Sequence, residues 1–146
     1  MEVLTRVSIF RTWPCDKPDS PEKKIVVGTL NIQNAKSNLL YLKQCLKRCD
    51  VLCIQEHWYF SYEKNDLTNI SSTHETQAKS VDDYTEKENF IHGRGYGGVA
   101  IFWRKDIDHE IKSHDDGNER INVISQHERA SSMHYKRLHA IRQFKS

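Results

Sequence analysis

The sequence predicts an α/β fold with parallel strands, and three observations support this prediction. Two short apolar runs, residues 25–30 and 51–54, have the composition of buried strands. Between them, residues 39–46 carry apolar side chains at helical spacing. A third apolar run, residues 99–103, follows a Gly-Gly pair farther along the chain. A strand, a helix and a strand within about 30 residues form a βαβ unit, in which the two strands run parallel.

The composition suits one domain with a small apolar core. A chain of 146 residues fits a single compact domain. However, only 37% of the residues are hydrophobic and 29% are charged, which is lean for a self-sufficient α/β domain. We therefore expect either a core that is partly missing or long polar loops. The net charge of +2 is too small to indicate nucleic-acid binding by itself.

The first part of the chain is expected to lead into this unit. Residues 1–24 are predicted to be a lead-in and linker, in which residues 3–10 could form a short strand and residues 16–24 are turn-rich and charged. After the first strand of the unit, Ser37 or Asn38 offers a side chain that can cap the helix. The helix is expected to close at Cys49-Asp50, directly before the second strand.

The carboxyl ends of the two parallel strands mark the expected ligand site. Asn31 follows the first strand, and Glu56 follows the second after one intervening residue. Parallel strands end at the same edge of a sheet, where ligands bind in open α/β folds. From the residues alone, Asn31 also suits a plain turn, and Glu56 also suits an exposed acidic residue after a strand.

The rest of the chain shows weaker patterns. Residues 57–92 are expected to be a long, largely irregular excursion, and His57 at its start is expected at the surface. Residues 115–118 carry a strong turn signal, and residues 120–125 are predicted to form a strand. Residues 126–146 form a basic tail, which suits either phosphate contacts or a solvated surface.

Cysteine spacing and hydropathy limit the setting of the protein. The four cysteines include no C-x2-C pair, so a structural zinc site is not expected. The chain shows no secretory signal pattern and no apolar stretch of membrane-spanning length. We therefore expect an intracellular protein with free thiols and no membrane partner, and the nucleus is compatible with this setting.

Three segments in order resemble one family. They are Thr29-Leu-Asn-Ile-Gln-Asn34, the run Asp50-Val-Leu-Cys-Ile-Gln-Glu-His-Trp58, and Arg94-Gly-Tyr-Gly-Gly-Val-Ala-Ile-Phe-Trp-Arg-Lys-Asp106. In this order and spacing they resemble the N-terminal half of endonuclease/exonuclease/phosphatase domains, in the version carried by non-LTR retrotransposons. The glycines of the third segment suit a bend before a strand.

This resemblance implies a fold, a reaction and a site. It implies a two-sheet α/β sandwich, truncated here to a partial domain over residues 25–125, that cleaves phosphodiester bonds of DNA with Mg²⁺ or Mn²⁺. By position, Asn31 and Glu56 fall at the catalytic, metal-binding end. Arg94 and Tyr96 are candidates for contacts to the nucleic acid. The oligomeric state is not fixed by any of these features.

The sequence also departs from the family pattern. The later Gly-Asp-Phe-Asn-like strand end and the Ser-Asp-His ending do not occur after Ser125, and Asn34 stands where the first motif usually has glycine. Enzymatic activity is therefore left open among three hypotheses. These are an active metal-dependent DNA nickase, a catalytically inactive remnant with an incomplete core, and a nucleic-acid-binding module without catalysis. We favour the second for this chain.

Overall fold

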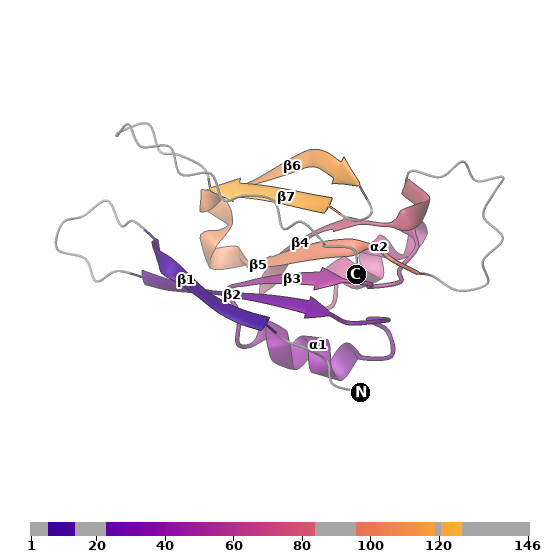
Figure 1. Cartoon of the computed structure of the whole chain (residues 1–146), viewed down its shortest axis with the longest axis horizontal. Coiled ribbons are helices and arrows are strands. Elements are labelled where there is room, and N and C mark those ends of the chain that lie inside the picture. The colour runs from indigo at the N-terminus through magenta and orange to yellow at the C-terminus, as the bar shows by residue number, and fades with distance from the viewer. Residues whose placement is uncertain (1–5, 14–22, 84–95, 119–120, 127–146) are drawn as a thin grey trace.

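The protein folds into a sheet of five strands and a separate two-stranded hairpin (Figure 1). The computed structural model describes residues 6–13, 23–83, 96–118 and 121–126. The strands of the larger sheet, in their order across it, are β1 (Arg6–Trp13), β2 (Lys23–Asn31), β3 (Val51–Gln55), β5 (Val99–Arg104) and β4 (His74–Lys79). The hairpin consists of β6 (Ile111–Asn118) and β7 (Ile121–Gln126). This architecture confirms the predicted fold class, an α/β fold that matches a truncated two-sheet sandwich.

The helical segments in the described ranges are short. They are α1 (Leu39–Leu46), α2 (Lys64–Thr68) and the 3-10 turns η1 (Ser61–Glu63), η2 (Val81–Asp83) and η4 (Lys105–Glu110). No helix in the described part of the chain is long and apolar enough to cross a membrane.

The predicted βαβ unit is present. Strands β2 and β3 are parallel, with the register running from Val27 opposite Val51 to Asn31 opposite Gln55. Helix α1 connects them but ends at Leu46, earlier than expected. Asn38 occupies the N-cap position without making a side-chain cap, because its Nδ2 donates instead to the carbonyl oxygen of Ile32 at 3.0 Å. That bond holds the loop after β2 against the start of the helix.

Alternate residues of the central strands enter two separate apolar clusters. Leu52 and Ile54 of β3 pack with Leu42 and Leu46 of α1 on one face of the sheet. The remaining buried members of this cluster are Leu30, Ile32, Ala35, Cys49, Tyr59, Leu67, Ala100 and Phe102. The two-residue period of the strand therefore sends half of β3 toward the helices.

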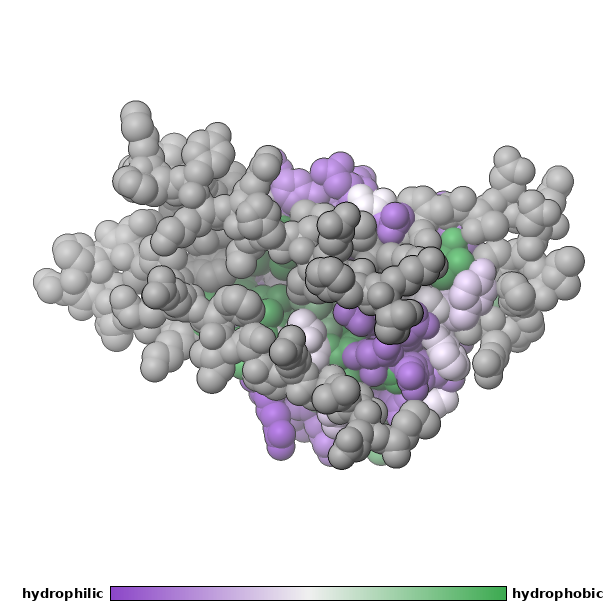
Figure 2. Space-filling model, in the orientation of Figure 1, coloured by the Kyte–Doolittle hydropathy of each residue, from purple (hydrophilic) through white to green (hydrophobic). Residues whose placement is uncertain are grey.

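The opposite face of the sheet is covered by the hairpin and by η4. Val51 and Cys53 of β3 pack there with Ile107 of η4, and Ile111 and Ile124 of the hairpin pack against them. Figure 1 shows α1 and the β6–β7 hairpin on opposite sides of the sheet, and in Figure 2 apolar residues are visible between hydrophilic regions. The central strands are therefore covered on both faces.

Two strands lie in segments that the sequence did not define well. Strand β4 falls inside residues 57–92, where we expected a long irregular excursion, and it pairs antiparallel with β5. Its sequence, His-Glu-Thr-Gln-Ala-Lys, lacks an apolar run because it is an edge strand. Strand β1 overlaps the short strand considered for residues 3–10 of the lead-in, but it runs over residues 6–13 and pairs with β2 in the sheet.

The turn predicted at residues 115–118 is instead part of a strand. Strand β6 continues to Asn118, with an irregular register between His114 and Gly117. Such a bulge accommodates turn-forming residues within a strand and increases its local twist. The strand predicted at residues 120–125 is confirmed as β7.

Candidate functional site

Asn31 and Glu56 lie at the same edge of the sheet, as the parallel strand order predicted. Asn31 is the last residue of β2 and faces Gln55 across the parallel pair, and Glu56 follows Gln55 directly. Asn31 is exposed and Glu56 is half-buried. The edge therefore presents one carboxylate and one amide side chain, both of which carry oxygen atoms that suit a hard cation.

Glu56 adopts a left-handed backbone conformation, with φ of +58°. Its N–H donates to the carbonyl oxygen of Gly98 at 2.9 Å, and its carbonyl oxygen accepts from the N–H of Asn34 at 2.9 Å. This conformation costs a residue with a side chain about 1–2 kcal/mol. It persists where the surroundings over-determine it, and such strain concentrates at functional sites.

The carboxylate of Glu56 is held through one of its two oxygen atoms. Oε2 accepts a hydrogen bond from the indole Nε1–H of Trp58 at 3.0 Å and another from the backbone N–H of Gly97 at 3.1 Å. Sequence reasoning missed both donors, although a tryptophan two residues after a candidate ligand is a visible signal. Oε1 receives no hydrogen bond from the residues that the structure describes.

The glycine pair before β5 shapes this edge. Gly97 and Gly98 have φ of +62° and +83°, which favour glycine. A Cβ on Gly97 would lie 2.7 Å from Cγ2 of Val81, and a Cβ on Gly98 would lie 2.5 Å from the His57 ring. The sequence predicted a bend before a strand at this place. The structure adds that the pair makes room for His57 while Gly97 donates to Glu56.

His57 is fully buried, so its predicted surface position is wrong. Its Nδ1 accepts a hydrogen bond from the N–H of Tyr59 at 3.0 Å, and its Nε2 lies 3.1 Å from the carbonyl oxygen of Lys79. A carbonyl only accepts, so the proton resides on Nε2. Burial lowers the pKa of His57 to about 4, against the partial opposing effect of the bond to Lys79. His57 is therefore a neutral structural residue at this edge.

The loop after β2 contains Asn34 at the position where the first motif usually has glycine. Gln33 and Asn34 have φ of 44° and 80°. Asparagine tolerates the left-handed region better than most residues. Its Oδ1 also accepts from the N–H groups of Lys36 at 3.1 Å and Ser37 at 3.3 Å. Asparagine therefore accommodates the left-handed turn beside Glu56.

Of the two residues predicted to contact nucleic acid, the structure describes Tyr96 but not Arg94. Tyr96 is 43% exposed and directly precedes Gly97, so it lies at the same edge as Glu56. Arg94 and the basic tail from residue 127 onward lie outside the described residues. Within the described ranges, no group of three or more His, Cys, Asp or Glu side chains gathers in a way that could hold a metal ion. A cation at this edge would therefore depend on few protein ligands.

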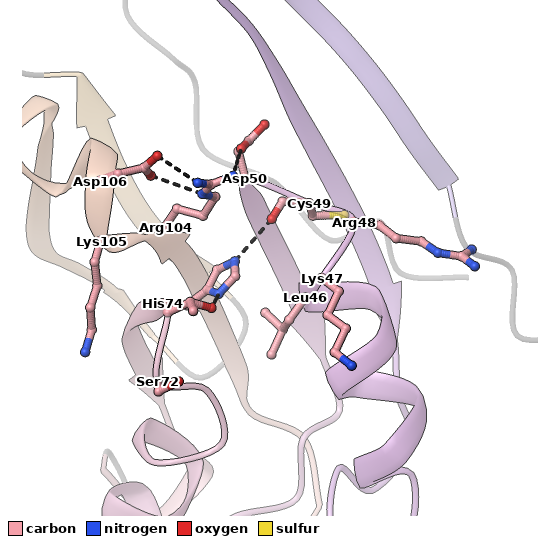
Figure 3. A pocket seen from close by; sticks show the side chains of 11 residues that line it. Leu46, Lys47, Arg48, Cys49, Asp50, Ser72, His74, Arg104, Lys105 and Asp106 are labelled. Atoms are coloured by element: carbon pink, nitrogen blue, oxygen red, sulfur yellow. Dashed lines mark hydrogen bonds and ion pairs between the residues drawn. The ribbon is translucent and has the colours of Figure 1, made fainter.

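A pocket of about 530 Å³ lies at the other end of β3 (Figure 3). Arg104 spans it, with an ion pair to Asp106 at 2.8 Å and another to Asp50 at 3.4 Å. His74 and Cys49 also line it, and Nε2 of His74 lies 3.1 Å from the carbonyl oxygen of Cys49. None of Asn31, Glu56 and Tyr96 lines this pocket. Because Arg104 pairs with both Asp50 and Asp106, we regard the pocket as a structural junction between the start of β3 and the end of β5.

Comparison with known proteins gives one family match. A model of the endonuclease/exonuclease/phosphatase family matches residues 28–137, about three quarters of the chain. The matched region includes Asn31, Glu56 and Tyr96, and it extends beyond residue 125, where we expected the domain to end. No curated protein and no solved structure gives a significant match.

Proposed function

The chain belongs to the endonuclease/exonuclease/phosphatase family, and on this premise we propose that it forms the metal-side half of a DNA endonuclease site of the non-LTR retrotransposon type. Family membership indicates a nuclease or phosphodiesterase type of function. One observation supports the narrower proposal. The half-buried Glu56 carboxylate is held through Oε2 at the same sheet edge as Asn31, where two parallel strands end, and no described residue donates to its Oε1.

The residues at this edge fit a divalent cation such as Mg²⁺ or Mn²⁺. Mg²⁺ prefers hard oxygen ligands and often binds through one or two carboxylates plus substrate phosphate and water. Glu56 offers a carboxylate oxygen, and Asn31 offers an exposed amide. A cation bound there would polarise a phosphate ester and lower the pKa of an attacking water. Glu56 and Asn31 would hold it, and Trp58 and Gly97 keep Glu56 in place.

The same sequence does not supply the rest of the reaction, and we propose that this chain is catalytically inactive by itself. The 146 residues contain no Ser-Asp-His sequence like the one expected near the end of the family's domains. His57 does not replace it, because both of its ring nitrogens are engaged and the ring is buried. General acid–base catalysis contributes about 10²–10⁴-fold to a rate, so its loss alone would severely reduce turnover.

Plasmid nicking in the presence of Mg²⁺ tests this proposal. We expect the full chain to convert supercoiled plasmid no faster than a Glu56→Gln variant does. Nicking that depends on Mg²⁺ and disappears in Glu56→Gln would instead show an active nickase. In that case the metal-side assignment stands and the proposal of inactivity is wrong.

A second candidate function is nucleic-acid binding without catalysis. It is favoured by Tyr96, an exposed aromatic side chain next to Gly97 at the same edge. Stacking of a base on an aromatic ring contributes about 1–3 kcal/mol. Tyr96→Ala should then weaken binding of a single-stranded oligonucleotide, whereas Tyr41→Ala on the exposed surface of α1 should not. Equal binding by both variants would remove this candidate.

A further inference from the structure

Among the described residues, one side chain donates a hydrogen bond to the Glu56 carboxylate. In the described part of the chain two donors bind it, both at Oε2: the indole Nε1–H of Trp58 at 3.0 Å and the backbone N–H of Gly97 at 3.1 Å. The Gly97 donor belongs to the main chain and is therefore retained in any substitution that preserves the fold. The indole is the side-chain contribution, and it can be removed by changing one residue.

We propose that Trp58 is a positioning residue for Glu56, which it orients through Oε2 so that Oε1 is the oxygen offered to a divalent cation. This inference rests on the function proposed above, since it concerns the same carboxylate. It adds a role for a residue that touches neither the substrate nor, by our assignment, the cation itself.

The backbone around Glu56 directs the indole toward the carboxylate. Trp58 has φ of +62°, so Glu56 and Trp58 are both left-handed on either side of His57. The N–H of Trp58 donates to the carbonyl oxygen of Gly97 at 3.1 Å, which ties Trp58 to the same glycine that donates to Glu56. A bulky residue adopts this conformation only where its surroundings enforce it. The hydrogen bonds of Trp58 to Gly97 and Glu56, together with the buried His57 ring, supply that enforcement.

The chemistry of indole suits this role. Its N–H only donates, so it cannot compete with Glu56 as a metal ligand. It is also neutral, so it fixes the carboxylate without cancelling the negative charge that attracts a cation. A lysine or arginine in the same place would form an ion pair and weaken cation binding. Partners that orient a metal ligand in this way commonly change metal affinity about 10–100-fold when they are removed.

A substitution that keeps the ring but removes the donor separates orientation from packing. Trp58→Phe retains an aromatic side chain and loses the Nε1–H. Trp103→Phe is the matched control, because Trp103 Nε1 also donates to a carboxylate, Asp108 Oδ1 at 2.7 Å, but lies in the cluster beneath the hairpin. Both variants lose an indole-to-carboxylate hydrogen bond, and only one of these bonds reaches Glu56.

The experiment is a titration of the full chain with Mn²⁺, in which free Mn²⁺ is followed by electron paramagnetic resonance. Wild type, Trp58→Phe, Trp103→Phe and Glu56→Gln are compared, and urea unfolding of each gives its stability. We expect Trp58→Phe to bind Mn²⁺ about 10–100-fold more weakly than wild type. Trp103→Phe should keep the wild-type affinity even if its stability falls, and Glu56→Gln should lose the site.

The outcomes separate this inference from the proposed function. If wild type binds, Glu56→Gln does not, and Trp58→Phe binds within about twofold of wild type, the positioning role is wrong while the metal-side assignment stands. If Trp58→Phe and Trp103→Phe lose affinity equally, the loss reflects general destabilisation, and the positioning role is again wrong. If wild type binds no Mn²⁺, or Glu56→Gln binds as well as wild type, both proposals fail together.

Discussion

The imidazole of His57 fills the space in which a side chain on Gly98 would lie. An ideal Cβ on Gly98 would come within 2.5 Å of both Cε1 and Nε2 of the ring. The same ring binds the end of β4 through Lys79 and the main chain at Tyr59. The ends of β3 and β4 and the start of β5 therefore meet at one buried histidine directly behind Glu56.

Gly98→Ala should destabilise the protein strongly. The substitution adds a Cβ at φ of +83° and forces it against a buried ring. We expect a loss of about 2–4 kcal/mol in the free energy of unfolding, measured by urea denaturation. Gly117→Ala is the control, since Gly117 is exposed and has φ of 114°, and it should lose only about 1 kcal/mol. Equal losses in the two variants would contradict the close packing of His57 on Gly98.

The stability of the protein should fall as the pH drops below 6.5. The folded-state pKa of His57 is about 4, below its ordinary value of 6.5. The unfolded chain therefore binds a proton that the folded chain excludes, and His57 stabilises the fold above pH 6.5 but loses this effect as the pH falls toward 4. We expect a decrease of about 2 kcal/mol between pH 7 and pH 5 from this residue.

His57→Gln isolates this pH effect. Glutamine keeps one donor and one acceptor but does not titrate. The difference in unfolding free energy between pH 7 and pH 5 should therefore be about 2 kcal/mol smaller in the variant than in wild type. An unchanged difference would mean that His57 is not held neutral in the folded state.

Two leucines of α1 test whether the helix covers the sheet. Leu42 is fully buried, whereas Leu40 is 79% exposed on the same helix. Leu42→Ala should cost about 2–5 kcal/mol, because it leaves a cavity in the cluster between α1 and β3. Leu40→Ala should change the free energy of unfolding, measured by urea denaturation, by no more than about 0.5 kcal/mol. Small effects from both variants would support the hypothesis of a poorly formed remnant.

Asn34 should tolerate glycine better than alanine. Its φ of 80° suits glycine. Its N–H donates to the carbonyl oxygen of Glu56 at 2.9 Å, a main-chain bond that neither substitution removes. Asn34→Ala places a Cβ in the left-handed region and also loses the Oδ1 acceptor. We expect the free energy of unfolding of Asn34→Ala to be about 1 kcal/mol lower than that of Asn34→Gly. The reverse order in thermal or urea denaturation would mean that the turn is not left-handed in solution.

The sequence predicts well the parts of the fold that rest on apolar runs. Residues 25–30, 51–54 and 99–103 all lie in strands of the sheet, and residues 39–46 form the expected helix. The shared edge of Asn31 and Glu56 also follows, because the parallel strand order fixes it. In these cases burial on both faces leaves a clear signal in the sequence.

Polar edge strands and long-range contacts leave no such signal. The residues of β4 alternate little in hydropathy because the strand lies at the edge of the sheet. The burial of His57 depends on Lys79 and Gly98, which lie 22 and 41 residues away along the chain. The hydrogen bond from Gly97 to Glu56 spans a separation of 41 residues. Such pairings arise only when the sheet is assembled, so a local pattern does not reveal them.

The most direct test of the central claim is a thermal melt of the full chain with and without Mg²⁺, compared between wild type and Glu56→Gln. The amide oxygen introduced by Glu56→Gln can still accept the bonds from Trp58 and Gly97, so the variant should fold but lose the charged ligand. A cation that binds only the folded state stabilises it by about 2.7 kcal/mol at about 100 times its Kd. We predict a Tm that Mg²⁺ raises in wild type and leaves unchanged in Glu56→Gln. Identical melts of wild type with and without Mg²⁺, or an equal rise in both proteins, would contradict a metal site at Glu56.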